Sequence, residues 1–190
     1  MISRRLLLTG SAACGLAALQ GGPARAQAVL TEDGIYREPW FLESFLELAD
    51  DLAAANEKRK RLAITWELRG CPYCKETHLV NFAKPEITDF VRQRFEVLQL
   101  NLIGSREVVD FDGEKLSEKR LAQKYDVRYT PTFQFFPETT EGLAGRKPRE
   151  REVARAQGYL QPPHFLAMFR YVAERAYEKG SLRDYLRANS

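Results

Sequence analysis

Two cysteines, Cys71 and Cys74, stand between a segment with strand character and one with helix character, and this arrangement constrains the fold more than any other feature. Residues 62–68 are mostly apolar and predict a buried strand. A helix-compatible stretch begins at Lys75, so Cys71 is expected near a helix N-terminus, where free N–H groups and the helix dipole favour a thiolate. Because the thiolate attacks disulfides, the pair is interpreted as a redox dithiol.

The short spacing argues against two other uses of the pair. A disulfide that closes so short a loop constrains the unfolded chain little, which makes it a poor structural crosslink. A zinc site needs further ligands. The remaining candidates are Cys14, His78 and His164, and they form no second CxxC or HxxxH motif. We therefore expect neither a metal nor a cofactor.

The N-terminus has the pattern of a targeting segment. Arg4 and Arg5 precede an apolar run over residues 6–19, and Ala24-Arg25-Ala26 fits an A-x-A cleavage site. Residues 1–26 are thus predicted to be a signal peptide cleaved after Ala26, and the paired arginines also resemble a twin-arginine signal. The expected location of residues 27–190 is the periplasm, where they are expected to form a single domain.

Charge excludes one class of partner. The chain has 29 basic and 26 acidic residues, and Arg4, Arg5 and Arg25 of the predicted signal account for the difference. The predicted mature chain is therefore balanced in charge. It lacks the basic surplus that is typical of nucleic-acid-binding proteins, so no nucleic-acid partner is expected.

The periodicity of apolar residues predicts an alternation of helices and strands, two of which form a parallel, right-handed βαβ unit around the cysteine pair. The expected elements are a helix over 39–56, a strand over 62–68, a helix over 74–94 interrupted near Pro85, a strand over 95–101, a hairpin arm over 108–111, a helix from Ser117, strands over 133–136 and 152–156, a helix over 162–177 and a short helix over 182–186. This order predicts an α/β fold in which helices flank a central mixed sheet, with an extra N-terminal helix and a C-terminal extension.

Residues 62–136 resemble the thioredoxin superfamily. The motifs that carry the resemblance are Cys71-Pro72-Tyr73-Cys74 and Thr130-Pro131-Thr132. It implies the thioredoxin fold, with Cys71 and Cys74 as the catalytic pair and Pro72, Tyr73, Thr130 and Pro131 as supporting residues. It also implies that Pro131 is cis beside the disulfide. The backbone of Thr130 would then pair with a bound substrate strand.

A finer resemblance is to the SoxW-type periplasmic thioredoxins of sulfur-oxidising bacteria. It is carried by residues 69–74, 110–117, 127–132 and 158–163 together with Phe165. It implies a monomeric protein-disulfide reductase that acts on disulfide-bearing periplasmic proteins of sulfur oxidation or cytochrome maturation. A membrane thiol-electron carrier of the CcdA or DsbD type would return it to the reduced state.

The chain departs from the thioredoxin pattern below the dithiol. Thr65 occupies the position of the buried acid that assists the second thiol in thioredoxins. Glu67 is the nearest acid before the pair, and two interpretations stay open: a proton relay for Cys74, or an exposed residue at the end of a strand. His78 is interpreted as a helix-surface residue and His164 as a helix-start residue, and neither is assigned a role.

Other functions remain as alternatives. A disulfide oxidant or isomerase would use the same pair, and the reduction potential distinguishes it from a reductase. The Pro72-Tyr73 dipeptide is typical of glutaredoxins, although the chain has no Gly-Gly-x-x-Asp-like glutathione motif. A non-catalytic binding module is the third alternative. Its docking face would use four aromatic residues, for which packing in the core and around the active site is preferred: Trp40, Trp66, Tyr73 and Tyr129.

Overall fold

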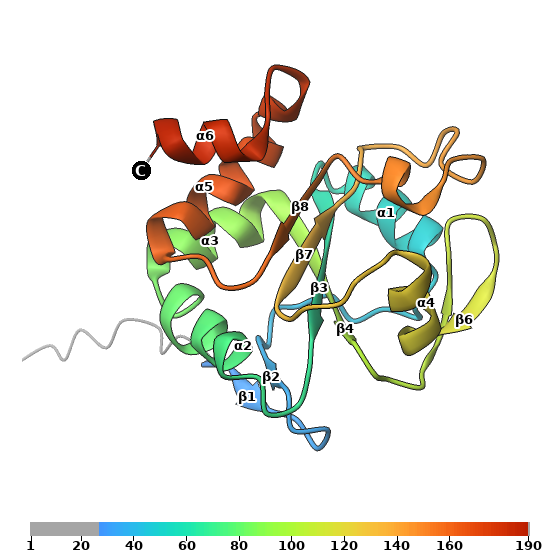
Figure 1. Cartoon of the computed structure of the whole chain (residues 1–190), viewed down its shortest axis with the longest axis horizontal. Helices are drawn as coiled ribbons and strands as arrows, with labels where there is room; N and C mark the ends of the chain where they lie inside the picture. The colour runs from blue at the N-terminus through green and yellow to red at the C-terminus, as the bar shows by residue number, and fades with distance from the viewer. Residues whose placement is uncertain (1–26, 190) are drawn as a thin grey trace, which may run out of the picture.

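A central sheet with helices on both faces dominates the computed structural model, which describes residues 27–189 (Figure 1). The predicted signal peptide, residues 1–26, lies outside the described residues. The helices are α1 (Leu48–Glu57), α2 (Pro72–Glu76), the π-helical turn η1 (Thr77–Asn81), α3 (Pro85–Arg94), α4 (Glu118–Lys124), the 3₁₀ turn η2 (Pro148–Arg151), α5 (Pro162–Ala173), the 3₁₀ turn η3 (Ala176–Glu178) and α6 (Leu182–Ala188). Between residues 27 and 189, none of these helices has the length and apolarity needed to cross a bilayer.

The main sheet has four strands in the order β4-β3-β7-β8. Its strands are β3 (Arg61–Glu67), β4 (Phe95–Asn101), β7 (Thr132–Phe135) and β8 (Ala154–Gln157). β3 and β4 are parallel, whereas β3 with β7 and β7 with β8 are antiparallel. The predicted βαβ unit and mixed sheet are therefore confirmed.

Alternation along the strands produces two apolar cores, one on each face of this sheet. Leu62, Ile64 and Trp66 of β3 pack with α1 and α4. Ala63 of β3 and Phe133 of β7 pack with α3 and α5 on the opposite face. Figure 1 shows the same arrangement, with α1 and α4 on one side of the strands and α3 and α5 on the other. Odd-numbered residues of β3 consequently face the side on which α3 and α5 lie.

Two predicted helix boundaries were wrong. The first helix begins at Leu48 rather than Pro39, since Leu46 has a φ of 65°, which an α-helix does not accommodate. Before it, the chain makes a turn at Glu38–Phe41, and Leu42 N–H donates to Val97 O of β4 at 2.8 Å. The last long helix ends at Ala173 instead of Tyr177, because Arg175 also adopts a left-handed conformation, with φ 55°.

Two small hairpins lie outside the main sheet. β1 (Val29–Leu30) pairs with β2 (Tyr36–Arg37) in a segment where no regular structure was expected. β5 (Glu107–Val109) pairs with β6 (Lys115–Ser117), which gives the predicted hairpin arm its partner strand. Ser117 caps α4 by accepting a hydrogen bond from Arg120 N–H at 3.3 Å, which explains why the helix starts there.

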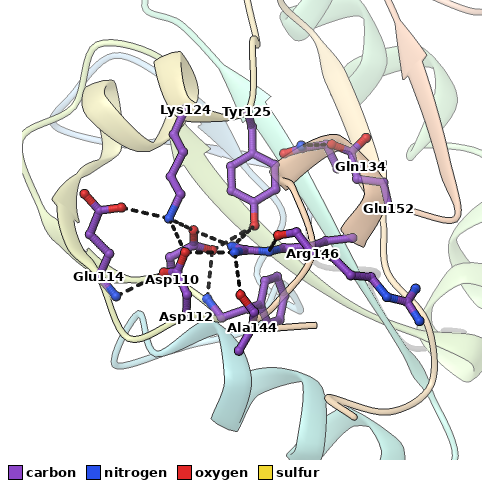
Figure 2. Close-up of polar contacts among 11 residues, drawn as sticks. Asp110, Asp112, Glu114, Lys124, Tyr125, Gln134, Ala144, Arg146 and Glu152 are labelled. Atoms are coloured by element: carbon purple, nitrogen blue, oxygen red, sulfur yellow. Dashed lines mark hydrogen bonds and ion pairs between the residues drawn. The ribbon is translucent and has the colours of Figure 1, made fainter. Parts of the chain in front are cut away.

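A buried polar network fixes the second hairpin to the rest of the domain (Figure 2). Arg151 donates to Asp110 Oδ2 and to Asp112 Oδ2, both at 2.8 Å, and Tyr125 donates its hydroxyl to Asp110 Oδ1 at 2.8 Å. Lys124 forms ion pairs with Asp110 and Asp112 at 2.5 and 2.6 Å. Burial alone would raise the pKa of Asp112, but hydrogen bonds from Lys124 and Arg151 hold it below its usual range.

Candidate functional site

The dithiol lies at the C-terminal end of β3, where the chain turns into α2. Glu67 is the last residue of the strand, and Gly70 has a φ of 73°, a conformation that a residue with a side chain rarely adopts. The turn closes when Cys71 N–H donates to Leu68 O at 3.2 Å. Cys71 therefore enters the helix as its N-cap residue, as the sequence predicted, and Pro72 occupies the first helical turn.

The two cysteines are joined as a disulfide but differ in their surroundings. Their Cα atoms are 5.3 Å apart. Cys71 is partly exposed, and its Sγ accepts a hydrogen bond from Cys74 N–H at 3.1 Å. Cys74 is only 3% exposed. An N–H group directed at Cys71 Sγ stabilises negative charge on that sulfur, which fits the attacking role predicted for it.

The loop before β7 brings Thr130 and Pro131 beside this pair. β7 is antiparallel to β3 with Trp66 opposite Thr132, so the start of β7 meets the end of β3. The Thr130–Pro131 peptide is cis, as the resemblance implied. Thr130 Oγ1 donates to Cys71 Sγ at 3.4 Å, and Thr130 O lies 3.7 Å from the same sulfur.

Aromatic residues around the dithiol have different surroundings. Tyr73 and Tyr129 are exposed beside the motifs that contain them, whereas Trp66 is buried in the core and donates its indole N–H to Gln134 Oε1. The Tyr73 ring stacks on Tyr159, with centroids 6.0 Å apart and planes 16° apart. The interpretation as packing residues therefore holds for Trp66, while the two exposed tyrosines flank the disulfide.

A buried charged cluster lies on the inner side of the helix that follows the dithiol. His78 Nδ1 is 2.9 Å from Glu38 Oε1, and His78 Nε2 is 3.0 and 3.1 Å from the two carboxylate oxygens of Glu67. Burial lowers the pKa of His78, but the Glu67 carboxylate, together with Glu38, outweighs it and raises the pKa to about 9. The raised pKa favours the imidazolium form, which can donate from both ring nitrogens to Glu38 and Glu67.

This cluster removes one of the two open interpretations of Glu67 and corrects the interpretation of His78. Glu67 is fully buried instead of exposed at a strand end, and His78 is 1% exposed, so it is not a helix-surface residue. The alternation along β3 could have indicated that Glu67 is buried, because odd-numbered residues of this strand face α3 and α5. Thr65 lies on the same face, and its Oγ1 donates to Glu67 Oε1 at 3.3 Å. No periodicity relates Glu38 to the dithiol, so it was missed.

Between residues 27 and 189, no group of three or more His, Cys, Asp or Glu side chains has an arrangement that could hold a metal ion. Glu38, Glu67 and Glu118, among the buried acids, are instead paired with His78 or Arg106.

Comparison with known proteins places this geometry in a family. Residues 48–173, more than half of the chain, match the thioredoxin-like domain family. A thioredoxin-fold protein from Helicobacter pylori has 21% sequence identity and a TM-score of 0.53, over 73% of this chain and 96% of that one. Among curated proteins no sequence matches this chain.

Two further solved structures are similar over shorter or less well superposed regions. A thioredoxin from Thermus thermophilus has 25% identity and a TM-score of 0.48, over 65% of this chain and 81% of that one. The C-terminal domain of DsbD from Neisseria meningitidis, in its oxidised form, has 15% identity and a TM-score of 0.43, over 70% of this chain and 90% of that one.

Proposed function

This chain belongs to the thioredoxin-like family, and from that premise we propose that it is a periplasmic protein-disulfide reductase that uses Cys71 as nucleophile and Cys74 as resolving thiol. Thiol–disulfide oxidoreduction follows from the family fold and the cysteine pair. One observation supports the unequal roles above all others: Cys74 N–H donates to Sγ of the partly exposed Cys71 at the helix N-terminus.

The proposed reaction proceeds in two exchanges. In the reduced protein, the Cys71 thiolate attacks one sulfur of a partner disulfide, that S–S bond breaks, and a mixed disulfide forms as one partner sulfur leaves as a thiolate. Cys74 then loses its proton and attacks Cys71 Sγ, which forms the Cys71–Cys74 disulfide. The mixed S–S bond breaks, the second partner sulfur leaves as a thiolate, and both partner thiolates take up protons. Two electrons have passed from the dithiol to the partner.

The position of Thr130 supports a mode of substrate binding. Its carbonyl oxygen and hydroxyl both lie beside Cys71 Sγ, in a loop that precedes a strand. We propose that an extended partner segment aligns along the Thr130 backbone so that its disulfide meets Cys71, in the manner of strand addition. Tyr73 and Tyr129 would contact residues on either side of the partner cysteine.

Location and partners are proposed from the sequence. The predicted signal peptide over 1–26 would export the chain, and the periplasm is a compartment in which disulfides persist. The resemblance to SoxW-type thioredoxins supports partners in sulfur oxidation or cytochrome maturation. Electrons would then enter from a membrane thiol carrier of the CcdA or DsbD type, because each turnover leaves Cys71 and Cys74 oxidised.

Substitution of the two cysteines one at a time tests the assignment. With insulin as the partner disulfide and dithiothreitol as the electron source, Cys71→Ser is expected to abolish the catalysed reduction. Pre-reduced Cys74→Ser, mixed with insulin after dithiothreitol has been removed, is expected to accumulate a mixed disulfide that is visible on a non-reducing gel, because Cys71 still attacks but neither Cys74 nor dithiothreitol resolves the adduct. Full insulin reduction by Cys71→Ser would refute the assigned nucleophile.

A further inference from the structure

We propose that the N-terminal segment, residues 27–47, is part of the redox site: its Glu38 holds the His78 imidazole against Glu67, and these three side chains together set the ionisation of the Cys74 thiol. This inference rests on the proposed function, because it takes Cys74 as the resolving thiol. Glu38 and His78 act through Glu67, so both are positioning residues.

The geometry of the cluster accommodates a protonated His78. Each ring nitrogen of His78 has a carboxylate oxygen within 3.0 Å, and an imidazole can donate from both nitrogens only when it is protonated. Glu38 is 4%, Glu67 0% and His78 1% exposed, so water does not replace either contact. In this proposal the cluster is an imidazolium between two carboxylates, with a net charge of minus one.

Other side chains complete the surroundings of the imidazole. Tyr36 is the further titratable group in ring contact with it, and its ring stacks at 6.4 Å between centroids. The apolar contacts come from two phenylalanines, one on the N-terminal segment and one after η1: Phe41 and Phe82. Among residues 27–189, the charged groups in hydrogen-bonding contact with His78 are thus the two glutamates.

The cluster lies close to Cys74 along the chain on both sides. Glu67 ends β3 directly before the turn that leads to Cys71, and His78 follows Cys74 by four residues on the same helix, about one turn. Cys74 is itself buried. Charged groups near a buried thiol change its pKa, since little water screens them.

The N-terminal segment is fixed to the redox site by several contacts besides Glu38. Arg69 Nε, two residues before Cys71, donates to Asp33 O at 2.7 Å. Gln99 of β4 donates to Tyr36 O at 2.7 Å. This segment precedes residues 48–173, which match the family, so Glu38 lies outside the matched region.

Replacing Glu38 with Gln gives a specific electrostatic change. The Gln amide can donate to Nδ1 while Nε2–H still donates to Glu67, so a neutral imidazole satisfies both contacts. His78 then loses its proton near the ordinary histidine pKa of about 6.5. Across neutral pH, the cluster changes from no net charge to minus one, and the Cys74 thiol becomes harder to ionise as the pH rises through this range.

The two thiols can be followed separately with 5,5′-dithiobis(2-nitrobenzoate). Cys71 of the reduced protein attacks the reagent disulfide and releases one thionitrobenzoate; Cys74 then attacks the mixed disulfide and releases the second. Stopped-flow absorbance between pH 5 and 9 gives a rate for each phase. The Cys74→Ser variant, which lacks the second phase, identifies it.

We expect Glu38→Gln to add a second inflection, near pH 6.5, to the plot of the second-phase rate against pH. Across the neutral range this rate is expected to change roughly three- to tenfold relative to wild type. The first phase retains its single inflection. Glu43→Gln is the matched control, because Glu43 lies in the same segment but is exposed and pairs with Arg37. It is expected to reproduce both wild-type profiles, and the double variant Glu38→Gln/His78→Gln is expected to lose the added inflection.

The outcomes separate this inference from the proposed function. If wild type shows neither phase, the proposed function is refuted. If wild type shows both phases but the second-phase rate of Glu38→Gln has the same pH dependence as that of wild type, the inference is overturned. If Glu38→Gln does not fold, an NMR titration of wild type decides. His78 is expected to stay protonated through the neutral range, measured against His164, and titration of His78 near pH 6.5 would overturn the proposal.

Discussion

At the residue scale, Cys71 and Cys74 share a helical turn yet have different chemistry. Cys71 is partly exposed, accepts an N–H at the helix N-terminus and contacts the Thr130 hydroxyl. Cys74 is buried, and four residues later His78 pairs with Glu67. These surroundings favour an early thiolate on Cys71 and controlled deprotonation of Cys74, which is the division of roles that two-step exchange requires.

The free energy of unfolding should depend on pH because His78 is charged in the folded protein. Its pKa is about 9 in the folded protein against 6.5 for an ordinary histidine. A folded-state pKa above the unfolded value stabilises the protein fully below pH 6.5, and the contribution disappears as the pH rises towards 9. We expect urea titrations to show a fall in unfolding free energy over this window, on the order of 3 kcal/mol from the pKa difference.

His78→Gln is the comparison for this prediction, because it removes the titrating group and keeps the ability to hydrogen-bond. Its unfolding free energy is expected to change less than that of wild type between pH 6.5 and 9. Parallel pH dependences for the two proteins would contradict a buried imidazolium between Glu38 and Glu67.

At the scale of elements, the network around Arg151 fastens the β5–β6 hairpin to α4 and to the turn η2. Arg151 is 3% exposed, and its guanidinium contacts Asp110, Asp112 and Tyr125. Removing one partner of a buried ion pair leaves an uncompensated charge. Arg151→Ala is therefore expected to lower the unfolding free energy by about 3 kcal/mol, measured by urea denaturation.

Arg149→Ala serves as the matched control for this substitution. Arg149 lies on the same 3₁₀ turn but is exposed, and it pairs with Glu152 at 3.3 Å. Its loss is expected to cost less than about 1 kcal/mol, as for other surface pairs. Equal effects of the two substitutions would show that the buried network contributes no more than a surface ion pair.

The elements that were predicted well are those fixed by local patterns. The apolar run before Cys71 became β3, residues 95–101 became β4, and Ser117 capped α4.

The first helix was placed too early because Trp40, Phe41 and Phe45 have helical spacing. In the structure, Phe41 is buried against Phe82, whereas Phe45 is exposed. Tertiary packing of the segment along β4, together with the left-handed Leu46, overrides the local pattern.

At the scale of the whole molecule, the sheet topology assembles the site from distant segments. The parallel β3–β4 pair and the antiparallel β7 place Cys71 beside Thr130, which lies 59 residues later in the chain. Both residues could be found from the sequence, because Cys71 lies in the CxxC motif and Thr130 precedes the proline that resembles the family's cis-proline. Glu38 and His78 belong to no such motif, since their pairing depends on how the N-terminal segment folds back against the helix, and only the three-dimensional structure joins them.

The direction of electron flow is a property of the whole protein and of the compartment in which it works. The most direct test is the reduction potential of the Cys71–Cys74 disulfide, obtained by equilibrating residues 27–190 in thiol–disulfide buffers and trapping free thiols by alkylation. A reductase is expected to have a value close to that of thioredoxin, about −270 mV. A value close to that of DsbA, about −120 mV, would contradict the proposed reductase and identify an oxidant.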